Sequence, residues 1–268
     1  MDRLFNLIHS LDASEKKFFK QYSERAIQQD ADYIQLFDAI NELKHWNEEL
    51  LKKKFPDRNQ TFSKLKRYLY DAILKAMSAY HAEQDERAQL YRAFVQIQFL
   101  HKKALYEDAL ELIHSSQEIA LSNDYLIEQL WLISHEILVV NAMSDKAGLK
   151  DAVKSLYPKA KKLIASIDNW FAYRTLYGVY KTNPNLLINP SFLHEEMSAT
   201  EAESLLGNEK IPISNAAKRI FYELNYLRSK AKFQVSNQIY CLQKLIGVYS
   251  QSKVSDYQTQ SVLSAILS

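Results

Sequence analysis

Glycine is scarce in this chain: four glycines and five prolines occur in 268 residues. Average proteins contain roughly 7% glycine and 5% proline. Because tight β-hairpin turns depend on glycine above all, the chain has few means of making hairpins. It also lacks a glycine-rich loop of the kind that wraps a phosphate group. The composition therefore predicts an all-α protein.

Apolar residues recur at helical spacing throughout the first third of the chain. The expected helices cover 13–27, a segment after Asp30, 47–55 and 61–80. Asp12 or Ser14 is the expected N-cap of the first of these helices, and Asn47 that of the third. Pro56 ends the third helix, since a residue before proline disfavours helical geometry. These helices predict a small N-terminal helical module, 1–81.

After about residue 82 the predicted helices come in pairs with short joints. The expected pairs are 86–102 with 105–121, 124–142 with 146–166, and 215–231 with 235–250, and a separate helix is expected over 168–181. Pro184 and Pro190 break the helical pattern, and the segment 183–213 is predicted to be a long connection with one short helix near 200–206. Segment 82–268 is therefore predicted to be an α-α superhelix of tetratricopeptide-like helix pairs.

An internal repeat with an offset of 127 residues supports the paired organisation. This offset matches Tyr106 with Phe233, and we expect each aromatic ring to plug the joint of its pair. The spacing of Tyr106, Ala109 and Ile113 resembles the second helix of a tetratricopeptide repeat. The resemblance implies that consecutive pairs stack on one another and bury each other's apolar faces.

A closer resemblance extends over most of the chain. The segments that carry it are Ser10–Lys20, Tyr33–Ile40, Leu50–Phe55, Arg67–Tyr70 and Ala217–Tyr222. They resemble an uncharacterised family of bacterial proteins with tetratricopeptide-like helices. Members of that family are often longer and carry further helix pairs at the C-terminus. The resemblance implies a scaffold and supplies no reaction.

Charge and cysteine content limit the functional classes. The net charge is +2, which does not point to nucleic acid or membrane, although 82–144 holds ten acidic and four basic residues between basic flanks. The single cysteine, Cys241, excludes an internal disulfide and is interpreted as a small buried hydrophobe. The apolar stretch Leu4–Ile8 is too short for a signal peptide, and no run spans a bilayer. We expect a cytoplasmic protein without membrane contact.

No catalytic or metal-binding motif is present. No two of the seven histidines lie three or four residues apart, so no helix face offers a histidine pair to a metal ion. His135-Glu136 opens like a zincin motif, but Val139 stands where the second histidine is needed. We therefore expect no enzyme activity and no cofactor.

The concave face of a helical-repeat stack is lined by the first helix of each pair, and it is the expected binding surface. The residues that the repeat places there are Gln98, His101, Lys102, Phe221, Asn225 and Arg228. We expect this surface to hold an extended or helical segment of a protein partner. Asn225 and Arg228 would contact its backbone or carboxylates.

An alternative is a nucleic-acid-binding regulator that uses the segment 47–80. Residues 50–75 carry a net charge of +6 on a short helix, a loop and a long helix, which is a helix–turn–helix in outline. The cations that would neutralise phosphates are Lys52, Lys53, Lys54, Arg58, Lys64, Lys66 and Arg67. The lack of glycine in the joint favours the other interpretation, a solvated helix face.

The C-terminal residues predict one more helix, from Ser255 to Leu267, whose apolar residues have no following helix to cover them. Repeat arrays normally end in a polar cap. Two explanations stay open: a homo-oligomer formed through this helix, or a natural protein that continues beyond Ser268.

Overall fold

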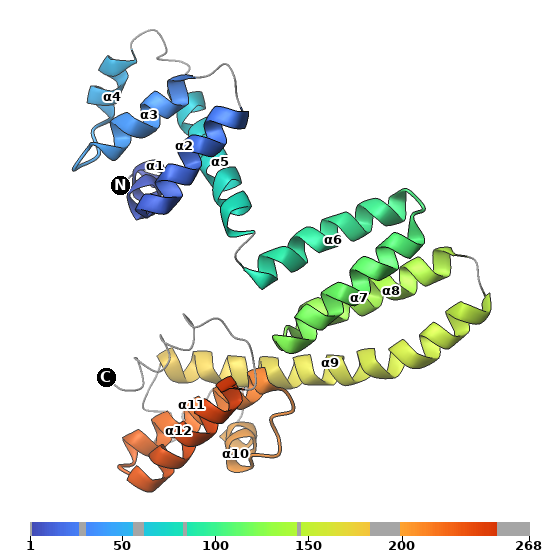
Figure 1. The fold of residues 1–268 in the computed structure, drawn as a ribbon. Coiled ribbons are helices and arrows are strands. Elements are labelled where there is room, and N and C mark those ends of the chain that lie inside the picture. Colours follow the sequence, from blue (N-terminus) through green and yellow to red (C-terminus); the bar gives the residue numbers. More distant parts are fainter. Residues whose placement is uncertain are drawn as a thin grey trace. The chain divides into compact units, whose positions relative to one another are not determined.

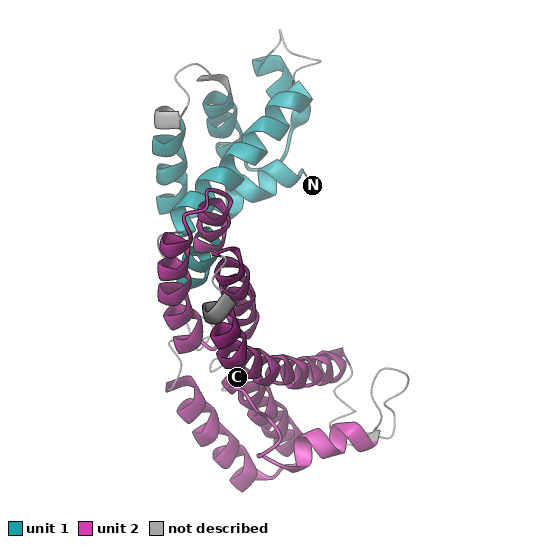
Figure 2. Ribbon diagram, turned by 90° about the vertical axis from the view of Figure 1, so that its right-hand side faces the viewer, with its two compact units in different colours: residues 1–92 teal, residues 93–268 magenta. Residues whose placement is uncertain are grey.

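The computed structural model describes residues 2–26, 31–55, 62–82, 85–143, 146–182 and 199–250. These residues form twelve helices and no strand (Figure 1), which confirms the all-α prediction. The chain divides into two compact units, Met1–Arg92 and Ala93–Ser268 (Figure 2), and the division falls inside a helix. The superhelical arrangement of tetratricopeptide-like pairs stays a prediction.

The first unit is built around its longest helix. Its elements are α1 (Arg3–Ser10), α2 (Ala13–Ala26), α3 (Ala31–Asn41), α4 (Glu48–Lys54) and α5 (Phe62–His81). Helix α5 packs against α1, α2 and α3. Phe19, Phe37 and Ile73 are fully buried at the centre of this packing, and the rings of Phe19 and Phe37 lie 4.7 Å apart.

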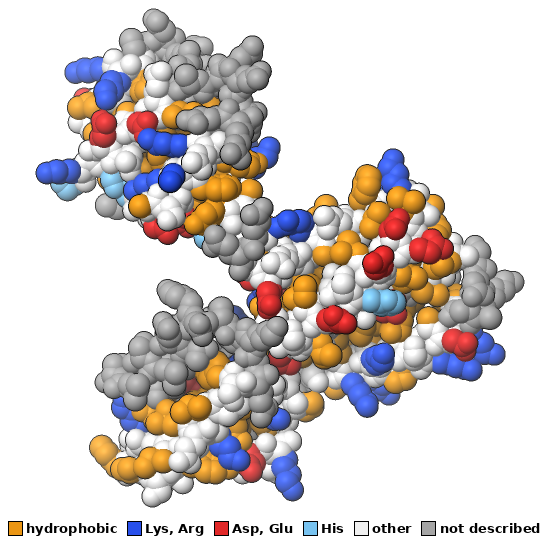
Figure 3. All heavy atoms as spheres, viewed as in Figure 1, with side chains coloured by type: hydrophobic (Ala, Val, Ile, Leu, Met, Phe, Trp, Pro, Cys, Tyr) orange, Lys and Arg blue, Asp and Glu red, His pale blue; other side chains and the backbone are white. Residues whose placement is uncertain are grey.

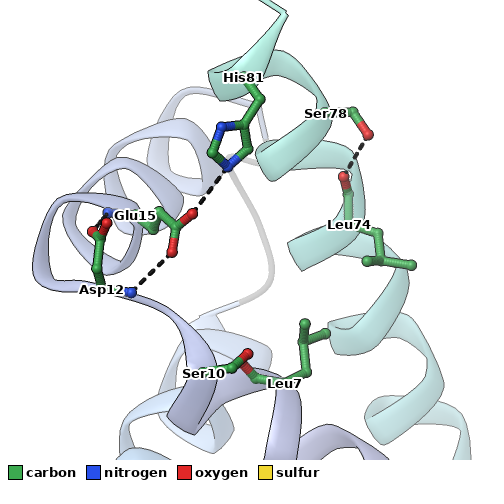
Figure 4. A network of polar contacts seen from close by, with 7 residues as sticks. All are labelled: Leu7, Ser10, Asp12, Glu15, Leu74, Ser78 and His81. Atoms are coloured by element: carbon green, nitrogen blue, oxygen red, sulfur yellow. Dashed lines mark hydrogen bonds and ion pairs between the residues drawn. The ribbon is translucent and has the colours of Figure 1, made fainter. Parts of the chain in front are cut away.

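Side-chain caps fix where these helices begin. Asp12 and Glu15 form a reciprocal capping box at α2: each carboxylate accepts the other residue's backbone N–H, at 2.8 and 2.9 Å. The Glu15 carboxylate also meets Nε2 of His81 at 2.9 Å, which ties α2 to the end of α5 (Figure 4). Asn47 accepts the Leu50 N–H at 3.0 Å and caps α4. The predicted caps Asp12 and Asn47 are thus confirmed.

Helix α1 has no counterpart among the expected helices. Asp2 is its N-cap and accepts the Leu4 N–H at 2.9 Å, while Leu4, Phe5 and Ile8 are buried. The apolar residues near the N-terminus are therefore part of the core of the first unit.

The second unit contains several long helices that follow one another through short joints. Its elements are α6 (Glu86–Lys102, which begins in the first unit), α7 (Tyr106–Ser122), α8 (Leu126–Ala142), α9 (Lys146–Thr182), α10 (Ala199–Gly207), α11 (Asn215–Ala231) and α12 (Val235–Ser250). Helix α8 packs on both α7 and α9, and α11 packs on α9, α10 and α12. The bounds expected for α6, α11 and α12 are confirmed. The expected helix 255–267 lies outside the described residues.

Helix α9 differs from the expected two helices: it runs unbroken for 37 residues and contains Pro158. The segment around Asp168 had the pattern of a helix start. In the structure the Ser166 hydroxyl instead donates to the Lys162 carbonyl, at 3.1 Å, and the helix continues. Ile167 and Trp170 extend the apolar face that Leu163 packs against α8, so burial favours continuation.

Three joints between helices share one geometry, and none uses glycine. Ala104, Asp124 and Phe233 have φ of 57°, 55° and 56°, the left-handed region. In each joint the next residue's N–H donates to the carbonyl five residues before it, at 2.9–3.0 Å, as in a Schellman motif. Phe233 is 90% exposed, so the prediction that it plugs a joint is wrong. The starts of α6 and α11, the starts of α7 and α12, and the joint residues Ala104 and Phe233 are each 129 residues apart, whereas the predicted offset was 127.

Candidate partner-binding site

Three aromatic side chains stack across the first helices of successive pairs. The ring centroids of Phe94 on α6 and Trp131 on α8 lie 3.8 Å apart, with their planes at 26°. The rings of Trp131 and His135 lie 3.5 Å apart at 20°. We call Phe94, Trp131 and His135 the α6–α8 stack. All three side chains are half-buried, so the stack reaches the surface.

The surroundings of His135 favour its neutral imidazole form. Its Nδ1 lies 3.1 Å from the Trp131 carbonyl, and since a carbonyl only accepts, Nδ1 carries the proton. Burial lowers the pKa of His135, and the nearby His101 acts in the same direction, against the effect of this hydrogen bond. The lowered pKa favours the neutral ring, which stacks on Trp131 without a charge to solvate.

Apolar side chains of α8 continue the surface on both sides of the stack. Ile127 and Leu138 lie four residues before and seven residues after Trp131, which places all three on one face of α8. Ile127 is 48% exposed and Leu138 is 49% exposed. We call Ile127, Trp131 and Leu138 the α8 stripe. The α8 stripe is therefore an apolar surface that a partner could contact, because the described part of the chain leaves it open to solvent.

Three of the expected binding residues lie beside the stack. Gln98 and His101 follow Phe94 by four and seven residues, so they share its face of α6. Gln98 and Lys102 are exposed, and His101 is half-buried, with its ring 5.9 Å from that of Tyr106. These three side chains border an open surface, and Gln98 carries both a hydrogen-bond donor and an acceptor.

The other three expected binding residues are engaged in contacts within the chain. Phe221 is 6% exposed and belongs to the core between α9, α10 and α11. Asn225 donates to the carbonyls of Leu206 and Phe221, at 3.4 and 3.1 Å, and Arg228 pairs with Glu203 at 2.5 Å. Phe221 is therefore part of the core, while Asn225 and Arg228 are half-buried and already bonded within the chain, because α10 docks against this face of α11. Its position was not evident from spacing.

The basic segment is partly neutralised by its own unit. Lys66 is half-buried, pairs with Asp2 at 2.5 Å and lies 4.6 Å from the ring of Trp46, so its charge is partly neutralised within the unit. Lys52 pairs with Glu48 at 3.0 Å. The remaining described cations of the alternative site are exposed, namely Lys53, Lys54, Lys64 and Arg67. Arg58 lies outside the described residues.

An open pocket of about 470 Å³ lies between α1 and α5, beside this segment. It is lined by Asp2, Arg3, Leu4, Ser63, Lys66, Arg67, Tyr70 and Asp71. The Arg3 guanidinium lies 5.6 Å from the centre of the Tyr70 ring. Two carboxylates among three cations leave this pocket with little net charge, unlike a dedicated phosphate site.

Reactive groups are few in the described part of the chain. Cys241 is 5% exposed, and burial raises the pKa of its thiol to about 11, which confirms the interpretation as a buried hydrophobe. The described residues contain no cluster of three histidine, cysteine or acidic side chains that could hold a metal ion. None of the described helices is long and apolar enough to cross a membrane. Comparison with models of protein families, with curated proteins and with solved structures found no match.

The stack and the α8 stripe were not among the expected site residues. Trp131 and His135 are four residues apart on one helix, which is a visible signal in the sequence. Their pairing with Phe94 was not visible, because it depends on how α6 crosses α8.

Proposed function

We propose that the protein is a non-enzymatic helical-repeat scaffold that binds a protein segment on the α6–α8 stack and the α8 stripe. The observation that supports the proposal is the run of half-exposed aromatic and aliphatic side chains on the first helices of two successive pairs. Contiguous apolar surface is uncommon on soluble proteins unless it serves an interaction.

The chemistry of this surface favours an apolar segment with a free backbone. Aliphatic or aromatic side chains of the partner would bury Ile127 and Leu138, at about 25 cal/mol for each Å² of apolar area removed from water. The half-exposed rings of the α6–α8 stack add aromatic contact area, and aromatic anchors dominate many interfaces. Gln98 would hydrogen-bond the partner's backbone, which would fix its register without requiring a particular side chain.

A peptide-display selection on the immobilised full chain tests this function. We expect enrichment of peptides with two or more large apolar residues, and a change in tryptophan fluorescence when they bind. The variant Ile127→Ser/Leu138→Ser should weaken binding about tenfold or more, because each serine removes apolar contact area.

The matched control is Ile239→Ser/Ile246→Ser on α12, whose side chains are 52% and 56% exposed. This control should bind the selected peptides like the native protein. If selection yields no peptide, or if the α8 and α12 variants bind equally well, the α6–α8 surface is not the binding site.

Nucleic-acid binding is a second candidate, favoured only by the exposed cations Lys53, Lys54, Lys64 and Arg67. A gel-shift titration at about 50 mM and about 200 mM salt tests it, because phosphate contacts make affinity fall steeply with salt. Absence of a shift at the lower salt rejects this candidate.

A further inference from the structure

The outward face of α7 is acidic. Residues Tyr106–Ser122 include four carboxylates and neither lysine nor arginine. Glu107, Glu111 and Glu118 have the spacing i, i+4, i+11, which aligns them along one side of the helix, and all three are exposed. Ala109 and Ile113, which are buried, lie on the opposite side. We call the three glutamates the acidic stripe.

Helix α9 carries lysines at the same spacing. Lys150, Lys154 and Lys161 are exposed, and they again fall at i, i+4, i+11 along one side of the helix. We call them the basic stripe. Large apolar side chains accompany them: Tyr157 is 64% exposed and Ile164 is 54% exposed.

Corresponding residues of the two stripes lie at a constant sequence offset, and the helices that carry them begin 40 residues apart, at Tyr106 and Lys146. Each lysine follows its glutamate counterpart by 43 residues. The same offset relates the buried residues Ile113 on α7 and Leu156 on α9. It also relates Leu121, which is 71% exposed, to Ile164. Acidic side chains therefore gather over α7, and basic ones lie along the outer edge of α9 (Figure 3).

None of the six stripe residues takes part in an ion pair within the described part of the chain. Both stripes point away from their buried faces, so the chain does not neutralise one with the other. The two stripes have opposite charge and the same spacing, so the acidic stripe of one copy matches the basic stripe of a second copy.

We propose that two copies of this protein associate by docking α7 of one copy against α9 of the other. In a parallel arrangement the matched spacing sets Glu107, Glu111 and Glu118 opposite Lys150, Lys154 and Lys161. Leu121 then meets Ile164 beyond the last charge pair. The acidic stripe of each copy then faces the basic stripe of the other copy, and these two equivalent contacts form a closed dimer.

The expected dimer is weak and salt-sensitive. Exposed ion pairs contribute little individually, and the charge attraction is screened beyond about 8 Å at physiological salt and about 3 Å at 1 M. Raising the salt from about 50 mM to about 500 mM should therefore weaken association about tenfold.

Sedimentation velocity on the full chain tests the proposal with two charge-reversed variants. One carries Glu107→Lys, Glu111→Lys and Glu118→Lys, and the other carries Lys150→Glu, Lys154→Glu and Lys161→Glu. Each variant should be monomeric where the native protein is dimeric, because each has stripes of one sign. An equimolar mixture should form mixed dimers, because opposite stripes then meet again.

Circular dichroism shows whether each variant is folded, and mixed-dimer formation itself requires both to be folded. The control for charge reversal as such carries Lys75→Glu, Lys230→Glu and Lys232→Glu, three exposed lysines outside the stripes; it should dimerise like the native protein. The proposal is overturned if the native chain stays monomeric at low salt, if the variants still dimerise, or if mixing them restores nothing. Salt-dependent binding of a monomeric native chain to anionic vesicles, lost in the lysine variant, would also overturn it.

Discussion

The joint between α11 and α12 offers a direct test of how the chain manages with so little glycine. Phe233 is held at φ 56°, where an L-residue pays about 1–2 kcal/mol relative to right-handed geometry. Glycine has no such penalty but loses about 0.4–1 kcal/mol more backbone entropy on folding. Because the Phe233 side chain is 90% exposed, its removal forfeits little packing. Phe233→Gly should therefore stabilise the protein by about 0.5–1 kcal/mol.

The neighbouring residue is the matched control. Lys232, the C-cap of α11, has φ of −95°, so glycine there relieves no strain and only adds freedom to the unfolded chain. Lys232→Gly should destabilise the protein by a few tenths to about 1 kcal/mol. Urea titrations followed by circular dichroism compare the two variants at constant slope. The reasoning fails if both substitutions shift the free energy of unfolding in the same direction.

The other two joints extend the test. Ala104→Gly should stabilise by a similar amount, since Ala104 has φ of 57° and an exposed side chain. Asp124→Gly should not, because one Asp124 carboxylate oxygen accepts the Ala216 N–H at 2.6 Å and tethers the joint to the start of α11. A variant at the third joint that behaved like the other two would show that this tether contributes nothing.

Three further predictions concern titratable groups. Burial raises the pKa of the Asp124 carboxyl, so its contribution to folding stability is present below the unfolded pKa and is lost as pH rises through the folded pKa. Asp124→Asn keeps an acceptor for the Ala216 N–H and does not ionise. In urea titrations this variant should become more stable relative to the native protein as pH rises through that range. Burial lowers the pKa of His135, so its contribution to folding stability is present above the unfolded pKa of about 6.5 and is lost as pH falls through the folded pKa. His135→Asn should therefore reduce the dependence of the unfolding free energy on pH in this range. An equal dependence in the variant and the native protein would contradict the lowered pKa. Burial raises the pKa of Cys241 to about 11, so a thiol reagent should label it only after unfolding, as seen by mass spectrometry; labelling of the folded chain would contradict this.

Local signals in the sequence were sufficient for most helices. The bounds of α6, α11 and α12 follow from apolar spacing at 3.6 residues, and Asn47 predicts the start of α4 because its side chain caps a free N–H. These signals act within one or two turns of the chain. Local signals fail where tertiary packing opposes them. Asp168 has the pattern of an N-cap, but Ile167 and Trp170 pack against the core and α9 continues past Asp168.

The candidate site was less predictable because it depends on contacts between distant segments. Helices α6 and α11 begin 129 residues apart, and the predicted offset of 127 turns each matched residue by about half a helical turn relative to these starts. The position of α10 over Asn225 and Arg228 has no signal in either helix alone, since it is fixed by polar contacts such as Glu203 with Arg228. Gln98 and His101 lie on the same face of α6 as Phe94, and the role of these two residues in binding stays a prediction.

The charge asymmetry along the chain gains a structural meaning from the helix pairs. A stretch with ten acidic and four basic residues need not produce an acidic surface, because alternating faces can mix the charges. Here the carboxylates of α7 fall on the side away from its buried residues, while the α8 stripe is apolar. The partner-binding surface and the self-association surface therefore use different helices and different chemistry. It follows that Ile127→Ser/Leu138→Ser should leave dimerisation unchanged, and that reversing the acidic stripe should leave the affinity for a selected apolar peptide unchanged. Loss of both properties in either variant would mean that the two surfaces are one.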